Sequence, residues 1–182
     1  MALDKNCIDT TTFNVLQPAI DYYIEHGSPD EQLRTYYYKG RIYQNQDNND
    51  LAMQSFMRGK EFCQEASDTL TMANLMVAQA TIQYRIYKID DFIKNNLEAA
   101  NLYSSIGRTD YELLSLANAL DGGILNNDKS LSDSVWNIAK QRVSENPDLG
   151  SIIVPYELSY ALKFGNKEDV IGILNHRESV DS

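Results

Sequence analysis

Residues 33–63 carry two stripes of apolar and small side chains, and this pattern constrains the fold more than any other feature of the chain. The positions recur at intervals of three and four residues, the spacing that brings side chains onto one face of a helix. The first stripe consists of Leu33, Tyr36, Tyr37, Gly40 and Tyr43, and the second of Ala52, Phe56, Gly59 and Cys63. A polar run over residues 46–50, QDNND, separates them and is typical of a turn. The pattern therefore predicts two antiparallel helices joined by a tight turn.

The segment before the first stripe carries the signals of a helix start. Ser28 can cap the helix with its hydroxyl, and Pro29 suits the first turn, where no backbone donor is needed. The carboxylates of Asp30 and Glu31 then lie near the positive end of the helix dipole. A helix is predicted to begin at about residue 30.

The small residues of the two stripes have predictable packing roles. Gly40 and Ala52 flank the turn, where two helix axes must approach closely. Tyr36 and Phe56 fill the wider space along the hairpin, and Gly59 leaves room for a third helix to dock on the second. The hairpin is therefore expected to be one unit of a longer stack of helices.

The complete motif resembles the signature of the tetratricopeptide repeat. It reads Tyr36-x3-Gly40-x2-Tyr43-x8-Ala52-x3-Phe56-x2-Gly59. The chain departs from the family pattern at Lys39, where leucine is usual, and at Gln64, where a closing proline is usual. The resemblance implies helix hairpins stacked into a solenoid whose first helices line an inner, peptide-binding surface.

The pair of a large residue followed by a small one recurs along the chain. Aligning the repeats with slightly unequal spacings carries Phe56/Gly59 onto Leu97/Ala100, then onto Trp136/Ala139, and finally onto Leu174/Arg177, where the pair fails. Such a failure fits a terminal or truncated repeat. Trp136 is accordingly predicted to be buried near Ala139. The period is longer than the usual one by about two helical turns, which lengthens the helices without rotating their apolar faces.

We therefore predict an all-α fold, an α-α superhelix in the form of a right-handed solenoid like that of tetratricopeptide repeats, with about nine antiparallel helices. One domain is expected over residues 1–182, with an N-terminal helix at 9–27 and helix hairpins at 29–67, 68–107, 108–146 and 147–178. The helices are expected at about 9–26, 30–46, 49–66, 69–88, 90–106, 109–125, 129–144, 149–164 and 167–178.

Charge and hydropathy exclude several functional classes. The chain has 16 basic and 26 acidic residues, a net charge of −10, so this segment is not expected to bind nucleic acid. No apolar run approaches the roughly 18 residues needed to span a bilayer, so no direct membrane insertion by this segment is expected. The start, MALDKNCIDT, lacks a secretory signal pattern. Both a cytoplasmic protein and an extracytoplasmic region of a membrane-tethered bacterial protein remain open.

The sequence contains no arrangement of residues that indicates catalysis. His26, His176, Cys7 and Cys63 are widely separated and form no metal-binding spacing, so no metal, no cofactor and no enzymatic activity are predicted. Cys63 is interpreted as a packed residue, although a disulfide is an alternative. The acidic runs at 47–50 and 90–91 are interpreted as turns and helix caps rather than calcium sites. The adjacent glycines at 122–123 are interpreted as a site of close helix packing.

The family resemblance implies a binding surface on the inner face of the solenoid. Its predicted members are Arg34, Tyr37, Arg41, Asn45, Leu75, Ile82, Arg85, Ile86 and Leu114. Gln44, Ala78, Ala117, Asp121, Ile124 and Leu125 are expected on the same face. Three arginines beside an apolar row favour a peptide with an acidic end and two or three aliphatic residues. The family's lysine–asparagine clamp for chaperone C-termini is not matched.

Two functional hypotheses follow. The first is a protein- or peptide-binding scaffold, a sensing or docking region of a larger protein, because the array resembles the helical-repeat regions of bacterial regulatory proteins. The alternative is small-molecule or lipid binding inside the solenoid. It also remains open whether the apolar row simply packs between helices, and whether the chain forms a homo-oligomer.

Overall fold

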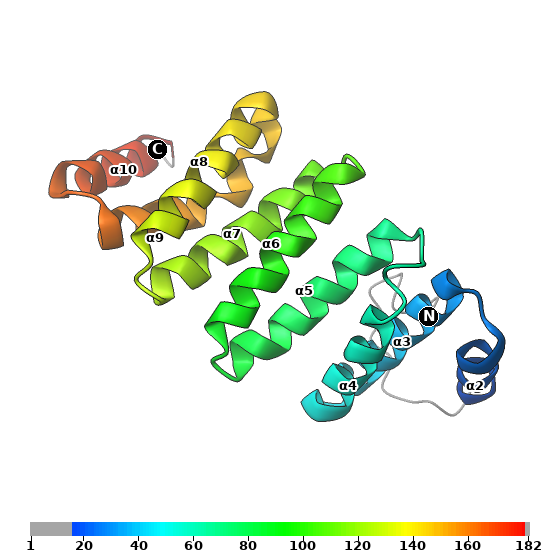
Figure 1. The fold of residues 1–182 in the computed structure, drawn as a ribbon. Helices are drawn as coiled ribbons and strands as arrows, with labels where there is room; N and C mark the ends of the chain where they lie inside the picture. Colours follow the sequence, from blue (N-terminus) through cyan, green and yellow to red (C-terminus); the bar gives the residue numbers. More distant parts are fainter. Residues whose placement is uncertain (1–15, 181–182) are drawn as a thin grey trace. The chain divides into compact units, whose positions relative to one another are not determined.

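The computed structural model describes residues 16–180, and the side chains of residues 16–175 within that range. These residues form α-helices and one short 3₁₀-helix, with no β-strand among them (Figure 1). Within each of the two compact units described next, the helices pack against neighbours in sequence order, which confirms the predicted all-α repeat-like fold. The chain divides into two compact units, residues 1–86 and 87–182, and the division falls inside the predicted hairpin 68–107.

The first unit contains four described helices. They are α2 (Gln17–His26), α3 (Pro29–Asn45), α4 (Asn49–Lys60) and α5 (Thr69–Arg85). Helix α3 contacts α2, α4 and α5, so it is the centre of this unit. Its start has the predicted signals: the Ser28 hydroxyl accepts a hydrogen bond from Glu31 N, and the Glu31 carboxylate accepts one from Ser28 N at 2.9 Å. This capping box satisfies two backbone donors at once.

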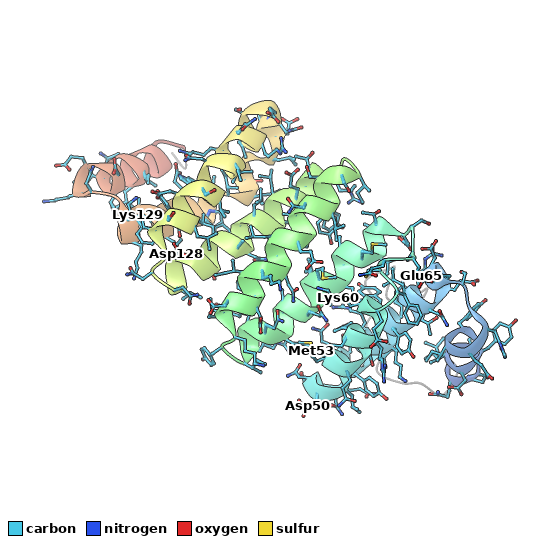
Figure 2. The ribbon with its side chains drawn as sticks, viewed as in Figure 1. Asp50, Met53, Lys60, Glu65, Asp128 and Lys129 are labelled. Carbon is cyan, nitrogen blue, oxygen red and sulfur yellow. The ribbon has the colours of Figure 1, made fainter. Side chains whose placement is uncertain are left out.

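The second unit is built around α7. Its elements are α6 (Ile89–Ser105), α7 (Thr109–Leu125), α8 (Lys129–Glu145), the 3₁₀-helix η1 (Pro147–Ile152), α9 (Val154–Phe164) and α10 (Lys167–Val180). Helix α7 contacts α6, α8 and α9. At the start of α8, labelled by Asp128 and Lys129 in Figure 2, the Asp128 carboxylate accepts a hydrogen bond from Leu131 N at 3.0 Å.

Most predicted helix bounds agree with the structure to within a few residues, and three differences have physical causes. The helix predicted at 49–66 ends at Lys60, because the backbone tightens into turns such as Phe62 N to Gly59 O at 3.1 Å. The helix predicted at 69–88 ends at Arg85, before Tyr87 adopts a positive φ of 58°. The helix predicted at 149–164 is interrupted after η1, and α9 begins just before Pro155. Residues 9–15 of the first predicted helix lie outside the described range.

The structure gives the repeat a constant period over three successive helix pairs. Helices α3, α5 and α7 have the same length of 17 residues, and they begin at the evenly spaced positions Pro29, Thr69 and Thr109. The turns that follow them contain left-handed residues at the same spacing: Asp47, Tyr87 and Asn127 have φ values of 56°, 58° and 57°. The unequal spacings used to align the first three repeats from the sequence are therefore wrong.

The constant period corrects the assignment in the second repeat. The counterpart of Phe56 and Trp136 is Asn96 rather than Leu97, and the small residue that accompanies it is Ala99 rather than Ala100. Asn96 is completely buried, like Phe56. Its amide nitrogen donates to Phe92 O at 2.9 Å, and its amide oxygen accepts from Asn118 Nδ2 at 3.3 Å. These bonds offset the cost of burying an amide in the position of a large apolar side chain.

The predicted packing of the small residues and of the tryptophan is confirmed. A Cβ atom on Gly40 would lie 2.3 Å from a ring carbon of Phe56. One on Gly59 would lie 2.7 Å from Leu75 Cδ1 on α5, the helix predicted to dock on α4. Trp136 is 7% exposed and belongs to the core cluster of the second unit together with Ala139. The glycines at 122–123 also lie at close helix contacts, against side chains of α6 and α8 respectively.

Candidate recesses on the two helical units

Two arginines of the predicted inner face form ion pairs within the first unit. Arg34 pairs with Asp68, which also caps the start of α5 by accepting from Thr71 N at 3.1 Å. Arg85 lies 3.8 Å from a carboxylate oxygen of Asp47. Both pairs join segments that are distant in sequence, but Asp47 is 92% exposed and its pair with Arg85 is weak, so only the Arg34–Asp68 pair is expected to help position α5.

The third arginine belongs to a chain of polar contacts between α3 and α5. Arg41 Nη1 donates to Gln44 Oε1 at 3.0 Å, and the buried Gln44 amide donates to Ala78 O at 3.4 Å. Because Arg41 takes part in this chain of contacts, replacing Arg41 and Arg85 with glutamate is expected to destabilise the unit as well as to change its surface. Their charge is therefore a poor guide to a binding surface.

The apolar members of the predicted face divide into buried and exposed residues. Leu75 and Ile82 are 0% and 2% exposed, so they are core residues and present no surface to a ligand. This agrees with the alternative that the apolar row packs between helices. Ile86 and Leu114 are exposed, and Leu114 belongs to α7 of the second unit.

The two remaining members of the predicted face lie on α3. Tyr37 and Asn45 are half-buried. The Tyr37 ring contacts Tyr38 edge-on, with ring centroids 5.1 Å apart. The structure thus assigns the nine predicted residues to core positions, internal polar contacts and separate exposed positions on two units.

A first recess of about 580 Å³ lies on the α3–α4 hairpin, outside the predicted face. Its lining residues, which define the first recess, are Tyr36, Lys39, Tyr43, Leu51, Gln54, Ser55, Met57, Arg58 and Glu61. The two ends of α4, which forms one wall, are marked by Asp50 and Lys60 in Figure 2. The Tyr36 ring stacks on Phe62 with centroids 5.9 Å apart, which holds this aromatic wall in place.

A second recess of about 500 Å³ lies in the second unit, where α6 and α8 flank α7. Its lining residues, which define the second recess, are Leu97, Ala100, Asn101, Ser104, Glu112, Leu116, Leu131, Ser134, Val135, Ile138, Gln141 and Arg142. Ile138 is 43% exposed, and Leu97 and Leu131 are partly exposed. The recess therefore offers an aliphatic surface along α8.

An arginine and two carboxylates form the polar end of the second recess. Arg142 Nε donates to Glu112 Oε1 at 2.8 Å, and Arg142 Nη1 donates to Glu145 Oε2 at 3.3 Å. The bond to the buried Glu112 carboxylate raises the pKa of Arg142. Hydrogen bonds from Gln141 and Arg142 lower the pKa of Glu145. The guanidinium is thus held by two carboxylates, and the rest of the recess presents apolar contacts.

Several positions of the two recesses are equivalent when the chain is shifted by two repeat periods. The equivalent pairs are Tyr36/Leu116, Leu51/Leu131, Gln54/Ser134, Ser55/Val135, Arg58/Ile138 and Glu61/Gln141. The same part of the repeat therefore forms a recess in each unit, with a polar and aromatic lining in the first and an aliphatic lining in the second.

Sequence reasoning missed both recesses because their walls come from two or three helices. A visible signal existed for the second recess: Leu131, Val135 and Ile138 follow one another at helical spacing. The resemblance to the tetratricopeptide repeat instead predicted a binding face on α3, α5 and α7.

Comparisons with protein-family models, curated proteins and solved structures gave no match for the chain. No helix within residues 16–180 is both long enough and apolar enough to cross a membrane. The described residues contain no group of three or more histidine, cysteine, aspartate or glutamate side chains that could hold a metal ion. Cys7 and the side chain of His176 lie outside this description.

Proposed function

We propose that the chain is a peptide-binding scaffold made of tetratricopeptide-like helix hairpins, and that the recesses on its hairpins are the docking positions. The observation that carries this proposal is the occurrence of a recess at equivalent repeat positions in both units. By resemblance to the helical-repeat regions of bacterial regulators, the chain would serve as the docking or sensing part of such a protein.

The second recess supports binding of a short peptide with aliphatic side chains. Ile138 and Leu131 expose apolar area that is removed from water when a ligand covers it, which is favourable by roughly 25 cal/mol for each Å². Asn101, Ser104 and Gln141 surround this area with amide and hydroxyl groups that can bond to a peptide backbone. An apolar groove with a polar rim is the usual form of a helix-binding surface.

A peptide display library selected on the whole chain tests this proposal. We expect enriched peptides that carry two or three aliphatic residues, and we expect their affinity to fall at least tenfold for Ile138→Glu. The substitution places a carboxylate in the apolar part of the recess, where burial of a charge is costly. Titration calorimetry measures the affinity, and circular dichroism confirms that the variant is folded.

Ile106→Glu is the matched control, because Ile106 is 40% exposed in the same unit but does not line the recess. Its affinity for the peptides should equal that of the unmodified chain. A library that yields no binder, or binders that ignore Ile138→Glu, contradicts the proposal. Displacement of a bound fluorescent hydrophobe by fatty acid but not by peptide would support the lipid-binding alternative instead.

A further inference from the structure

We propose that the first recess binds an acidic peptide segment that is anchored by one apolar side chain. This inference rests on the proposed peptide-binding function and specifies the chemistry of a ligand for the first unit. It arises from the contrast in charge between the two equivalent recesses.

The lining of the first recess is positively charged, although the chain as a whole has a net charge of −10. Lys39 on α3 and Arg58 on α4 supply two positive charges, and Glu61 supplies one negative charge. In the second recess the counterpart of Arg58 is Ile138, and the position equivalent to Lys39 is the buried Ala119. The two cations are thus specific to the first recess.

Both cations are available to a ligand. Among the residues that the structure describes, Lys39 has no ion-pair partner. Arg58 lies 3.2 Å from both carboxylate oxygens of Glu61, and the two side chains are 66% and 58% exposed. An ion pair so exposed to solvent is weak, so a ligand carboxylate can replace it. Because the cations come from different helices, a ligand with two carboxylates can contact both walls.

The remaining lining supplies an apolar anchor site beside the cations. Tyr36 and Tyr43 provide aromatic surface, and Met57, which is 60% exposed, provides a flexible apolar side chain that adapts to different ligands. Apolar contacts exclude water from neighbouring ion pairs and strengthen them. The combination favours an acidic peptide over an isolated anion.

Fluorescence anisotropy with three labelled peptides on the full chain tests the inference. The first probe is a twelve-residue peptide with four glutamates and one central leucine, the second has glutamine in place of every glutamate, and the third has alanine in place of leucine. We expect the first probe to bind at least tenfold more tightly than either of the others. We also expect its affinity to fall as salt is raised from low to physiological concentration.

The variant Lys39→Glu/Arg58→Glu should weaken binding of the acidic probe at least tenfold, whereas Lys39→Arg/Arg58→Lys should retain it. Lys94→Glu/Lys163→Glu, in which both lysines are exposed and lie outside the recess, is the control for the change in net charge. Equal binding of the acidic probe to the charge-reversed variant and to this control would overturn the inference.

The outcomes for the two proposals can be separated. If neutral aliphatic peptides bind in a manner sensitive to Ile138→Glu while acidic peptides do not bind, the inference fails and the proposed function stands. If peptides of neither kind bind, both proposals fail. Equal binding of inorganic phosphate and the acidic probe at the first recess would also overturn the inference, because the apolar anchor would then have no role.

Discussion

The α3–α4 hairpin and the α7–α8 hairpin share one backbone plan but accommodate the aromatic side chain at one equivalent repeat position differently. In α3–α4, the Phe56 ring lies against Gly40 of its own hairpin. In α7–α8, Leu120 occupies the position of Gly40, and Trp136 instead stacks on Tyr160 of α9 with ring centroids 5.6 Å apart. The same repeat position can therefore stabilise a hairpin internally or attach it to the next element.

The glycine at the close helix contact occupies a different repeat position in each hairpin. In the α7–α8 hairpin the close approach is at Gly123, where an added Cβ atom would lie 2.7 Å from Ser132 Oγ. Gly123 is equivalent to Tyr43 of the first hairpin. A repeat can thus exchange large and small residues across one interface while its helix lengths and turns stay constant.

Truncation of the two aromatic residues should have the largest effect. Phe56→Ala and Trp136→Ala should each lower the free energy of unfolding by about 3–5 kcal/mol, because each leaves a cavity in a packed core. Chemical denaturation followed by far-UV circular dichroism measures both changes. Trp136 is the only tryptophan, so its fluorescence reports on the second unit in Phe56→Ala. A loss below about 1 kcal/mol for either variant would contradict the assigned core role.

Alanine at the two glycines should have smaller and unequal effects. Gly40→Ala should destabilise the protein by about 1–2 kcal/mol, because the methyl group displaces the Phe56 ring and this cost exceeds the gain in helix propensity. Gly123→Ala should cost less than Gly40→Ala, because its methyl group meets the single Ser132 hydroxyl instead of an aromatic ring, although displacing this buried hydroxyl weakens its hydrogen bond to Asp128 O.

Thermal and urea denaturation of the two glycine variants measure this difference. The double variant Gly40→Ala/Phe56→Leu should recover part of the loss, since it returns space to the added methyl group. Equal destabilisation by the two single alanine substitutions would show that the hairpins do not differ as described.

The smallest predicted effect is a difference in the pH dependence of the two units. Hydrogen bonds from the Ser67 hydroxyl and from the backbone at Asp68 and Ser67 lower the pKa of Asp30 in the first unit. The resulting stabilisation is present above the unfolded pKa, about 3.9, and is lost as the pH falls through the lower folded pKa. The stability difference between the unmodified chain and Asp30→Asn should therefore shrink in acid.

In the second unit the corresponding change occurs in alkali. Burial, together with the hydrogen bond that Tyr160 donates to Asp133, raises the pKa of Tyr160 to about 12. The resulting stabilisation is complete below the unfolded pKa of about 10 and is lost as the pH rises toward 12. The stability difference between the unmodified chain and Tyr160→Phe should therefore shrink over this range. A constant difference across the alkaline range would contradict the assignment.

The helices could be predicted from the sequence because their signals are local. Apolar spacing and capping residues such as Ser28 act within a few residues, and the helix predicted at 109–125 has those bounds in the structure. The register of the second repeat could not be predicted in this way. The sequence assigns the repeat position to the large apolar residue Leu97, because a polar residue is not expected in the core. Burial of Asn96 there depends on its hydrogen bonds to Phe92 and Asn118.

The surface could be predicted less well than the fold. Leu75 and Ile82 are apolar residues of the kind that line a groove, but neighbouring helices bury them. Helical spacing alone does not show whether another helix or a ligand covers an apolar helix face. The recesses depend on the distance between helices, which follows from packing of residues such as Gly59 against Leu75. Such distances are a property of the assembled unit.

The turn between α5 and α6 has a consequence for local unfolding and proteolysis. Asp47 and Asn127 are residue types that tolerate the left-handed conformation, and the helices after them are capped by the side chains of Asn48 and Asp128. At the equivalent turn, Tyr87 is 88% exposed in that conformation, and Lys88 provides no side-chain cap for α6. Among the three equivalent turns, amide hydrogens should exchange fastest at this one, and trypsin should cut it before the other two; it lies in the sequence between the two compact units.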